Sequence, residues 1–253
     1  MSFTIQKYRV GMYKLSVITV TYNAEATLER TLRSVQSQSQ SDIEHIIVDG
    51  NSQDGTVALI ERYANERTNW VSEPDKGLYD AMNKAAAMAT GDYLCFLNAG
   101  DTFHADTTVE EIMRSIPQGS VPDIIYGQTA IVDGNGRFLH MRRLEAPKVL
   151  TWKSFKQGML VCHQAFIVRH GLFEPYDLGY RFSSDFDWAV KLLKRAKVMH
   201  YTDMTLIDYL NEGLTTTNHK ASLKERYKIM AKHYGQVSTA LHHAWFVVRA
   251  LFK

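Results

Sequence analysis

The 253-residue sequence contains only two cysteines and no long hydrophobic run. Cys95 and Cys162 form no Cys-x-x-Cys pair and stand in apolar stretches, a setting typical of buried free thiols in a reducing compartment. No stretch reaches about 18 uninterrupted apolar residues, so no membrane-spanning helix is expected. Residues 1–14 lack the apolar segment of a secretory signal. These absences predict a cytoplasmic protein.

A strong excess of charge of either sign is also absent. The 29 lysines and arginines nearly balance the 27 acidic residues, and the net charge is +2. This balance argues against a nucleic acid partner. Hydrophobic residues make up 45% of the chain and charged residues 22%, which excludes a disordered or fibrous protein. A chain of this length buries about 70–75% of its unfolded surface, so it forms a core without disulfides or structural metals.

The common signatures of several enzyme classes are missing. There is no Gly-x-x-x-x-Gly-Lys-Ser/Thr loop and no His-Glu-x-x-His pair. Gly134 and Gly136 are not followed by the third glycine of a dinucleotide-binding turn, and Ser52 lacks the final glycine of a nucleophile elbow. Hydride transfer, P-loop phosphoryl transfer and acyl transfer therefore lose their usual support.

Short apolar segments alternate with helical patterns in the first hundred residues. Such alternation predicts an α/β fold with a parallel sheet covered on both faces. Beyond Asp106 we expect a hairpin that turns at residues 133–136, further strands and a helical C-terminus. The expected strands are residues 15–20, 45–48, 70–71, 93–97, 123–126, 128–132, 137–141, 165–168, 198–201 and 205–209, and the clearest later helix is 186–196.

Polar residues follow three of the expected parallel strands. Thr21 and Tyr22 follow the first, Asp49 the second, and Asn98 with Asp101 the fourth. Ligands of open parallel sheets bind beyond the carboxyl ends of the strands, so these side chains are expected to converge. Each acid alone is as well explained as a turn former. Together they favour a divalent metal whose coordination a diphosphate completes.

Four segments occur in this order: Leu15–Asn23, Ile46–Thr56, Ser72–Lys84 and Thr90–Asp101. Together they resemble family 2 glycosyltransferases, in particular the bacterial branch that builds O-antigen, capsule and exopolysaccharide. A fifth, weaker match follows at Tyr180–Trp188. The resemblance implies a GT-A fold, a nucleotide-sugar donor, here a UDP-sugar, and an inverting transfer to a glycan acceptor.

The resemblance assigns roles to residues of the donor site. Asp49 matches the aspartate that accepts a hydrogen bond from the base of the nucleotide, although Gly50 stands where many members carry a second acid. Thr21 and Tyr22 match residues that border the base. Further donor-binding positions are Lys76 and Asn83, which line the nucleotide pocket, and Asn98, which bonds the ribose or a phosphate.

The metal motif of the family is reduced in this chain. Many members carry several acids at this position, whereas this chain keeps a single carboxylate at Asp101. We expect Asp101 to hold a divalent metal, Mn²⁺ or Mg²⁺, with ligands borrowed from phosphate and water. His163 is a candidate extra ligand, and His104 a weaker one; a histidine in either place is more often an ordinary surface or hydrogen-bonded side chain.

The catalytic base is expected at Asp185. In an inverting displacement, a carboxylate accepts the proton of the acceptor hydroxyl that attacks the anomeric carbon. Asp187 would point about 200° away from Asp185 on one helix. We therefore interpret Asp187 as an acid favoured by the helix dipole.

The C-terminal residues form two amphipathic helical stripes flanked by lysine and arginine. Packing against the domain or a partner explains such stripes, and so does an interfacial helix on anionic lipid. The latter would suit an acceptor carried on polyprenyl diphosphate at the inner face of the membrane. We expect an N-terminal extension at 1–13, a nucleotide-sugar-binding half at 14–106, an acceptor-binding and catalytic half of the same domain at 107–214, and a tail at 215–253.

Two other functions remain open from the sequence. A nucleotidyltransferase would use a related sheet, but its basic glycine-rich loop is missing here. A catalytically silent nucleotide-sugar-binding or scaffold protein is compatible with the reduced motif at residues 98–101. The sequence does not name the sugar, the linkage or the acceptor.

Overall fold

The computed structural model describes residues 13–40, 42–211 and 219–251. The expected N-terminal extension therefore lies outside the described residues except for Tyr13, and so does the start of the expected tail.

The N-terminal half contains the alternating strands and helices that the sequence predicts. The strands β1 (Leu15–Thr21), β2 (Ile43–Asp49), β3 (Thr68–Ser72) and β4 (Tyr93–Phe96) run parallel in the order β3-β2-β1-β4. Their connections contain α1 (Glu25–Gln36), α2 (Thr56–Tyr63) and α3 (Leu78–Met88). Because all four strands are parallel, the loops that follow them meet at one edge of the sheet.

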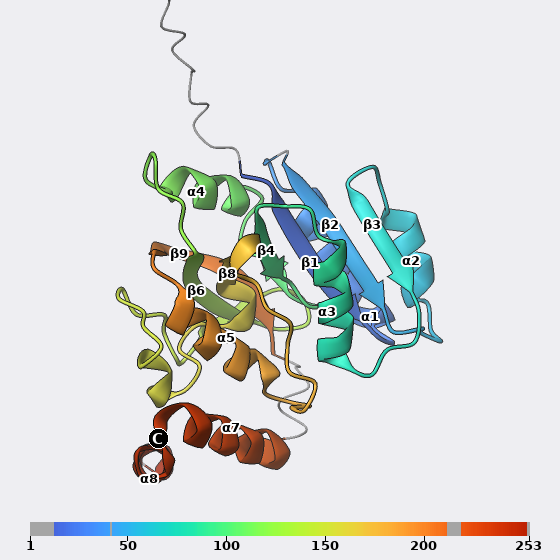
Figure 1. Cartoon of the computed structure of the whole chain (residues 1–253). Coiled ribbons are helices and arrows are strands. Elements are labelled where there is room, and N and C mark those ends of the chain that lie inside the picture. The colour runs from blue at the N-terminus through green and yellow to red at the C-terminus, as the bar shows by residue number, and fades with distance from the viewer. Residues whose placement is uncertain (1–12, 41, 212–218, 252–253) are drawn as a thin grey trace, which may run out of the picture.

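Helices cover both faces of this parallel half (Figure 1). On one face, Leu28 and Leu32 of α1 and Ile60 of α2 pack against Ile47 of β2. On the other face, α3 packs against β1 and β2 in the larger core. Spacing of apolar residues at three and four positions gives each helix the single buried stripe that this packing needs.

The C-terminal half makes the sheet mixed. Next to β4 lies antiparallel β8 (Phe166–Arg169), then antiparallel β6 (Ile124–Val132). β9 (Met199–Leu210) runs parallel to β6 and pairs with the short β5 (Thr102–Phe103) at the edge. The expected hairpin forms between β6 and β7 (Phe138–Met141). The sheet is thus parallel in its first half and mixed beyond β4.

Two pairs of expected strands merge into single long strands. Residues 123–126 and 128–132 join in β6, and residues 198–201 and 205–209 join in β9. The register of the two strands shifts around Gly127, where an added Cβ would lie 2.6 Å from Oγ1 of Thr202. A glycine at this close approach lets the ladder continue through the irregularity. Sequence analysis also missed β5 and the short helix α4 (Thr108–Ser115).

The C-terminal helices are α7 (His219–Tyr234) and α8 (Gln236–Leu251), and α7 packs on α5 (Ser184–Arg195) (Figure 1). The contact is centred on Asp187 of α5, whose carboxylate is buried. It lies 2.8 Å from Nζ of Lys191, 3.2 Å from Nζ of Lys232 and 2.7 Å from Nε2 of His233. Asp187 is therefore more than an acid at a helix start: it joins the tail to the domain.

No helix in the described part of the chain combines the length and the apolar character that crossing a membrane requires.

Candidate functional site

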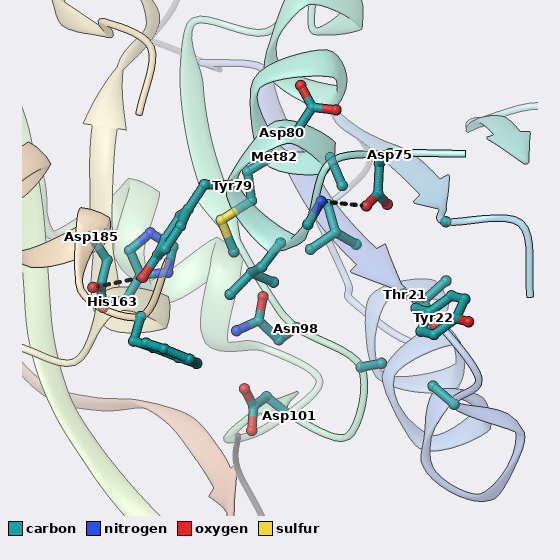
Figure 2. A pocket seen from close by; sticks show the side chains of 18 of the residues that line it. Thr21, Tyr22, Asp75, Tyr79, Asp80, Met82, Asn98, Asp101, His163 and Asp185 are labelled. Atoms are coloured by element: carbon teal, nitrogen blue, oxygen red, sulfur yellow. Dashed lines mark hydrogen bonds between the residues drawn. The ribbon is translucent and has the colours of Figure 1, made fainter. Parts of the chain in front are cut away.

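A cleft of about 1570 Å³ opens where the parallel strands end. It runs from Thr21 and Tyr22, after β1, past Asn98 and Asp101 to His163 and Asp185 on the opposite side (Figure 2). The structure brings together seven of the predicted residues in its wall: Thr21, Tyr22, Lys76, Asn98, Asp101, His163 and Asp185.

The β1 end of the cleft presents an exposed ring and an unsatisfied hydroxyl. The Tyr22 side chain is 63% exposed. Oγ1 of Thr21 is buried and has no hydrogen-bond partner among the described residues. Asn98 Oδ1, in the middle of the cleft, is likewise buried without a hydrogen-bond partner among the described residues. Buried polar atoms without partners are costly, so both are suited to a polar ligand in this cleft.

Asp49 does not line the cleft, contrary to our expectation. Its side chain is fully buried, and its two oxygens accept hydrogen bonds from the backbone N–H of Ser52 at 2.9 Å, the Ser52 hydroxyl, and the Ser72 hydroxyl at 2.6 Å. Side chains alternate between the faces of a strand, and Asp49 shares the face of Ile47, which packs against α1 and α2. Asp49 thus fixes the loop after β2.

Asp75, which sequence analysis left without a role, stands in the cleft instead. Its Oδ1 accepts a 2.7 Å hydrogen bond from the backbone N–H of Gly77. Its Oδ2 lies 2.6 Å from the position that a Cβ on Gly50 would occupy. The only signal in the sequence was indirect: Gly50 leaves room where many family members carry an acid.

The two predicted residues of this segment, Lys76 and Asn83, differ in whether they line the cleft. Lys76 lines the cleft with an exposed side chain. Asn83 does not line it, because its amide is bonded to the backbone of Tyr176: Nδ2 donates to the carbonyl at 3.0 Å, and Oδ1 accepts from the N–H at 2.8 Å. Asn83 therefore ties α3 to the segment that precedes α5 and does not line the cleft.

Asp101 lies in the middle of the cleft with its carboxylate nearly buried. Oδ1 accepts a hydrogen bond from the backbone N–H of Leu210 at 2.9 Å, and Oδ2 accepts one from Nε2 of Gln164 at 2.7 Å. Burial raises the pKa of Asp101 to about 7, although both hydrogen bonds oppose the shift. The end of β9 and the loop before β8 thus hold this carboxylate in place.

Asp185 and His163 form the far side of the cleft (Figure 2). Oδ1 of Asp185 accepts a 2.9 Å hydrogen bond from the hydroxyl of Tyr79. Nε2 of His163 lies 2.8 Å from the hydroxyl of Tyr176, and burial lowers the pKa of this histidine. The carboxylate of Asp187, two residues along α5, lies in the ion cluster with α7, so the two acids face different surroundings, as their spacing predicts.

Residues 16–176 match the family model described as "Glycosyl transferase family 2". This chain is a family 2 glycosyltransferase.

Curated relatives agree with this assignment. The "PGL/p-HBAD biosynthesis glycosyltransferase" of Mycobacterium bovis BCG is 33% identical over 211 residues, which cover 80% of this chain and 79% of the relative. The "Amylovoran biosynthesis glycosyltransferase AmsB" of Erwinia amylovora is 36% identical over 138 residues, or 51% of this chain and 46% of that protein. The predicted family is therefore confirmed, with relatives in bacterial polysaccharide biosynthesis.

Solved structures of GT-A glycosyltransferases share the fold. The S. aureus TarS fragment in complex with UDP-GlcNAc has a TM-score of 0.70 at 20% identity over 90% of this chain, which spans 66% of that structure. The mannosyltransferase PcManGT of Pyrobaculum calidifontis, in complex with GDP-Man and Mn²⁺, has a TM-score of 0.63 at 16% identity, over 91% of this chain and 70% of that one. The predicted GT-A fold is confirmed.

This family 2 glycosyltransferase offers few protein ligands for a metal. Within the described residues there is no group of three or more His, Cys, Asp or Glu side chains that would hold an ion. His104 is not in the cleft wall, since its Nδ1 lies 2.7 Å from Oδ1 of Asp208. Asp101, with Asn98 nearby, fits only a cation that brings most of its ligands with it.

Several residues of the glycosyltransferase cleft were not predicted. Tyr79, Gln164, Arg142 and Arg226 all line it. Arg226 belongs to α7, so the C-terminal helix contributes to the cleft wall. Tyr79 lies within the matched segment Ser72–Lys84 and Gln164 follows His163, but no role was assigned to either. Arg142 and Arg226 reach the cleft only through the packing of distant segments.

Proposed function

We propose that this glycosyltransferase transfers a sugar from a UDP-sugar to a glycan acceptor with inversion, in the synthesis of a bacterial surface polysaccharide. The order of groups along the cleft carries the proposal. An aromatic ring and polar groups at the β1 end suit the nucleoside. Asn98 and Asp101 lie at the centre of the cleft, and the carboxylate of Asp185 lies in the opposite wall. The UDP-GlcNAc complex of TarS supports this class of donor.

Asp185 is the proposed catalytic base. Its carboxylate takes the proton of the acceptor hydroxyl while that oxygen attacks the anomeric carbon, and the bond to the diphosphate breaks on the opposite side. Tyr79 donates to Oδ1 and so holds the carboxylate in one orientation. Burial, followed by the charge of Asp185, raises the pKa of Tyr79 well above its ordinary value, so the phenol stays protonated as a donor.

We further propose that Mn²⁺ or Mg²⁺ enters with the donor. Asp101 and Asn98 would hold it, and the remaining ligands come from the diphosphate and water. When bound, the cation stabilises the charge on the departing diphosphate. The Mn²⁺ and GDP-Man of PcManGT support this expectation. His163 is a poor additional ligand, because its Nε2 is engaged with Tyr176.

The acceptor is proposed to be lipid-linked, and the enzyme to lie on the inner face of the cell membrane. Support comes from α8, whose Val237, Leu241 and Trp245 are 75%, 67% and 57% exposed. These residues recur every four positions and form one apolar face, together with Val248. An exposed apolar helical face with an indole ring suits the interfacial region of a bilayer.

Turnover tests the proposal. Release of nucleoside diphosphate is measured with a panel of UDP-, GDP- and CDP-sugars, with and without a polyprenyl-diphosphate-linked glycan acceptor, in Mn²⁺ and in EDTA. We expect acceptor-dependent release with one UDP-sugar and a product of inverted anomeric configuration. Acceptor-dependent release from GDP- or CDP-sugars alone would refute the UDP assignment, and a product of retained configuration would refute the role of Asp185.

A further inference from the structure

We propose that Asp75 recognises the base of the nucleotide and selects uracil, in place of an acid after Asp49. This inference rests on the proposed function, because it takes the cleft to hold a UDP-sugar. It concerns a residue that neither the family motif of this chain nor our reading of the sequence assigned to the base.

The argument starts from the space beside Gly50. A Cβ added to Gly50 would lie 2.6 Å from Oδ2 of Asp75, 3.4 Å from its Cγ and 3.3 Å from Cδ2 of Tyr22. A side chain at position 50 would require the Asp75 carboxylate to shift, so in this structure the carboxylate of Asp75 fills the volume beside Gly50. The β-ladder continues to this point, since the Gly50 N–H donates to the Thr21 carbonyl at 2.9 Å. The carboxylate of Asp75 therefore stands beside Gly50, the position at which many family members carry an acid.

The Asp75 carboxylate is oriented by its own loop. The N–H of Gly77 donates to Oδ1 at 2.7 Å, and Gly77 has a φ of +114°, which disfavours any residue with a side chain. Oδ2 lies on the side of Gly50, and the ring of Tyr22 borders the same position. Figure 2 shows Asp75 and Tyr22 at the same end of the cleft. A fixed acceptor beside an exposed aromatic ring has the two features that bind a planar base: edge recognition and stacking.

Asp49 is not available for this role. Its carboxylate is fully buried and already accepts three hydrogen bonds from Ser52 and Ser72. Contact with a ligand would break those bonds and remove a satisfied charge from its partners. The carboxylate of Asp75, in contrast, lines the cleft, and its Oδ1 accepts the hydrogen bond from Gly77.

The chemistry of a carboxylate at this place distinguishes between bases. Uracil presents one N–H, at N3, between two carbonyls, and a carboxylate oxygen accepts it. Cytosine has an unprotonated N3 and therefore places a lone pair against the carboxylate. Guanine presents two neighbouring N–H groups that are best matched by two free carboxylate oxygens, but Oδ1 is occupied by Gly77. One free oxygen thus favours uracil.

The test measures the affinity of the full chain for UDP, CDP and GDP by calorimetry. We expect the wild type to prefer UDP, and Asp75→Asn to bind UDP about 10- to 100-fold more weakly, as loss of a hydrogen bond to a charged group predicts. CDP affinity should not fall, because an amide N–H suits N3 of cytosine. Asp80→Asn is the matched control: Asp80 also lines the cleft, but its carboxylate accepts the N–H of Lys76.

A second variant moves the acid from position 75 to position 50. Recovery of binding by this variant cannot result from a folding defect. The double variant Gly50→Asp with Asp75→Ala returns a carboxylate to position 50 and removes the one that would clash. We expect it to recover UDP preference relative to Asp75→Ala alone. The proposal is overturned if Asp75→Asn keeps wild-type UDP affinity and UDP-over-CDP preference, or if Asp80→Asn loses as much.

The experiment distinguishes failure of the role of Asp75 from failure of the proposed UDP-sugar donor. If the wild type binds UDP and the Asp75 variants are unchanged, only the role of Asp75 is wrong. If the wild type binds none of the three nucleotides, or prefers GDP or CDP, the UDP-sugar donor of the proposed function is wrong as well.

Discussion

The hydroxyl of Tyr79 donates a 2.9 Å hydrogen bond to Oδ1 of Asp185, and this bond joins the first turn of α3 to the first turn of α5 across the cleft. The two residues are 106 positions apart. Tyr79 belongs to the half of the domain that the motifs assign to donor binding. It thus orients Asp185, the carboxylate that we propose to act on the acceptor.

The first prediction concerns Asp185→Asn. The amide still accepts the Tyr79 hydrogen bond but takes no proton, so we expect transfer to fall about 10²- to 10⁴-fold. Affinity for the nucleoside diphosphate should stay close to wild type. Asp177→Asn is the control, because Asp177 is on the loop before α5 but does not line the cleft. Full transfer by Asp185→Asn would place the base elsewhere.

The second prediction concerns Tyr79→Phe, which removes only the hydroxyl. Asp185 then loses the donor that holds its carboxylate in one orientation. We expect a roughly tenfold drop in kcat/KM. Wild-type kcat/KM in Tyr79→Phe would show that this hydrogen bond does not support the proposed base.

The third prediction concerns the cation. Asp101→Ala should abolish the difference between activity in Mn²⁺ and in EDTA, and most activity with it, because Asp101 is the only carboxylate that the described residues place at the centre of the cleft wall. His104→Ala should leave the Mn²⁺ response intact, since its ring pairs with Asp208 away from the cleft. A wild-type Mn²⁺ response in Asp101→Ala would remove this residue from the proposed metal site.

The fourth prediction concerns the stability of the contact between α5 and α7. Burial raises the pKa of Asp187, but hydrogen bonds from His233, Lys191 and Lys232 outweigh it and hold the pKa below its usual value. The ionised form is thus favoured in the folded state. Its contribution to the free energy of unfolding is complete above the unfolded-state pKa of about 3.9 and is lost as the pH falls through the lower folded-state value.

Asp187→Asn should therefore lower the free energy of unfolding by about 3–5 kcal/mol at pH 7, the usual effect of breaking a buried ion pair. The difference from wild type should shrink below about pH 4. Urea denaturation at several pH values measures it, with the exposed Glu66→Gln as control. A difference independent of pH would show that the charge of Asp187 is not what stabilises this contact.

The fifth prediction concerns the apolar face of α8. Leu241→Asp and Trp245→Ser should weaken co-sedimentation with vesicles that contain anionic lipid, while leaving the thermal midpoint nearly unchanged because both side chains are mostly exposed. Val149→Ser, which removes an equally exposed apolar residue elsewhere, should have no effect on vesicle binding. Equal binding by all variants would exclude α8 as the membrane contact.

Local pattern was sufficient for most elements of this fold. The short apolar runs before Thr21, Asp49 and Asn98 predicted parallel strands, and their polar ends predicted one functional edge. These features depend on residues near one another in sequence, and strand alternation and helical spacing report them directly. The family followed from the same segments, because its motifs lie at those strand ends.

Side-chain direction and long-range partners required the tertiary structure. Asp49 and Gly50 are adjacent, yet only the packing of β2 between its helices shows that the acid is buried and that the glycine faces the cleft. Asn83 was expected at the nucleotide and is instead bonded to Tyr176, 93 residues away. Asp187 was expected to be a minor helix acid and instead anchors α7.

The sequence by itself thus determined the order of most elements, the sheet edge at which the cleft opens and the residue types available there. The tertiary structure decided which of those residues face the cleft, that Asp75 fills the place beside Gly50, and that Tyr79 reaches Asp185. The physical reason is that strand and helix periodicity is a local property, whereas burial and hydrogen-bond partners are set by segments that come together only when the chain is folded.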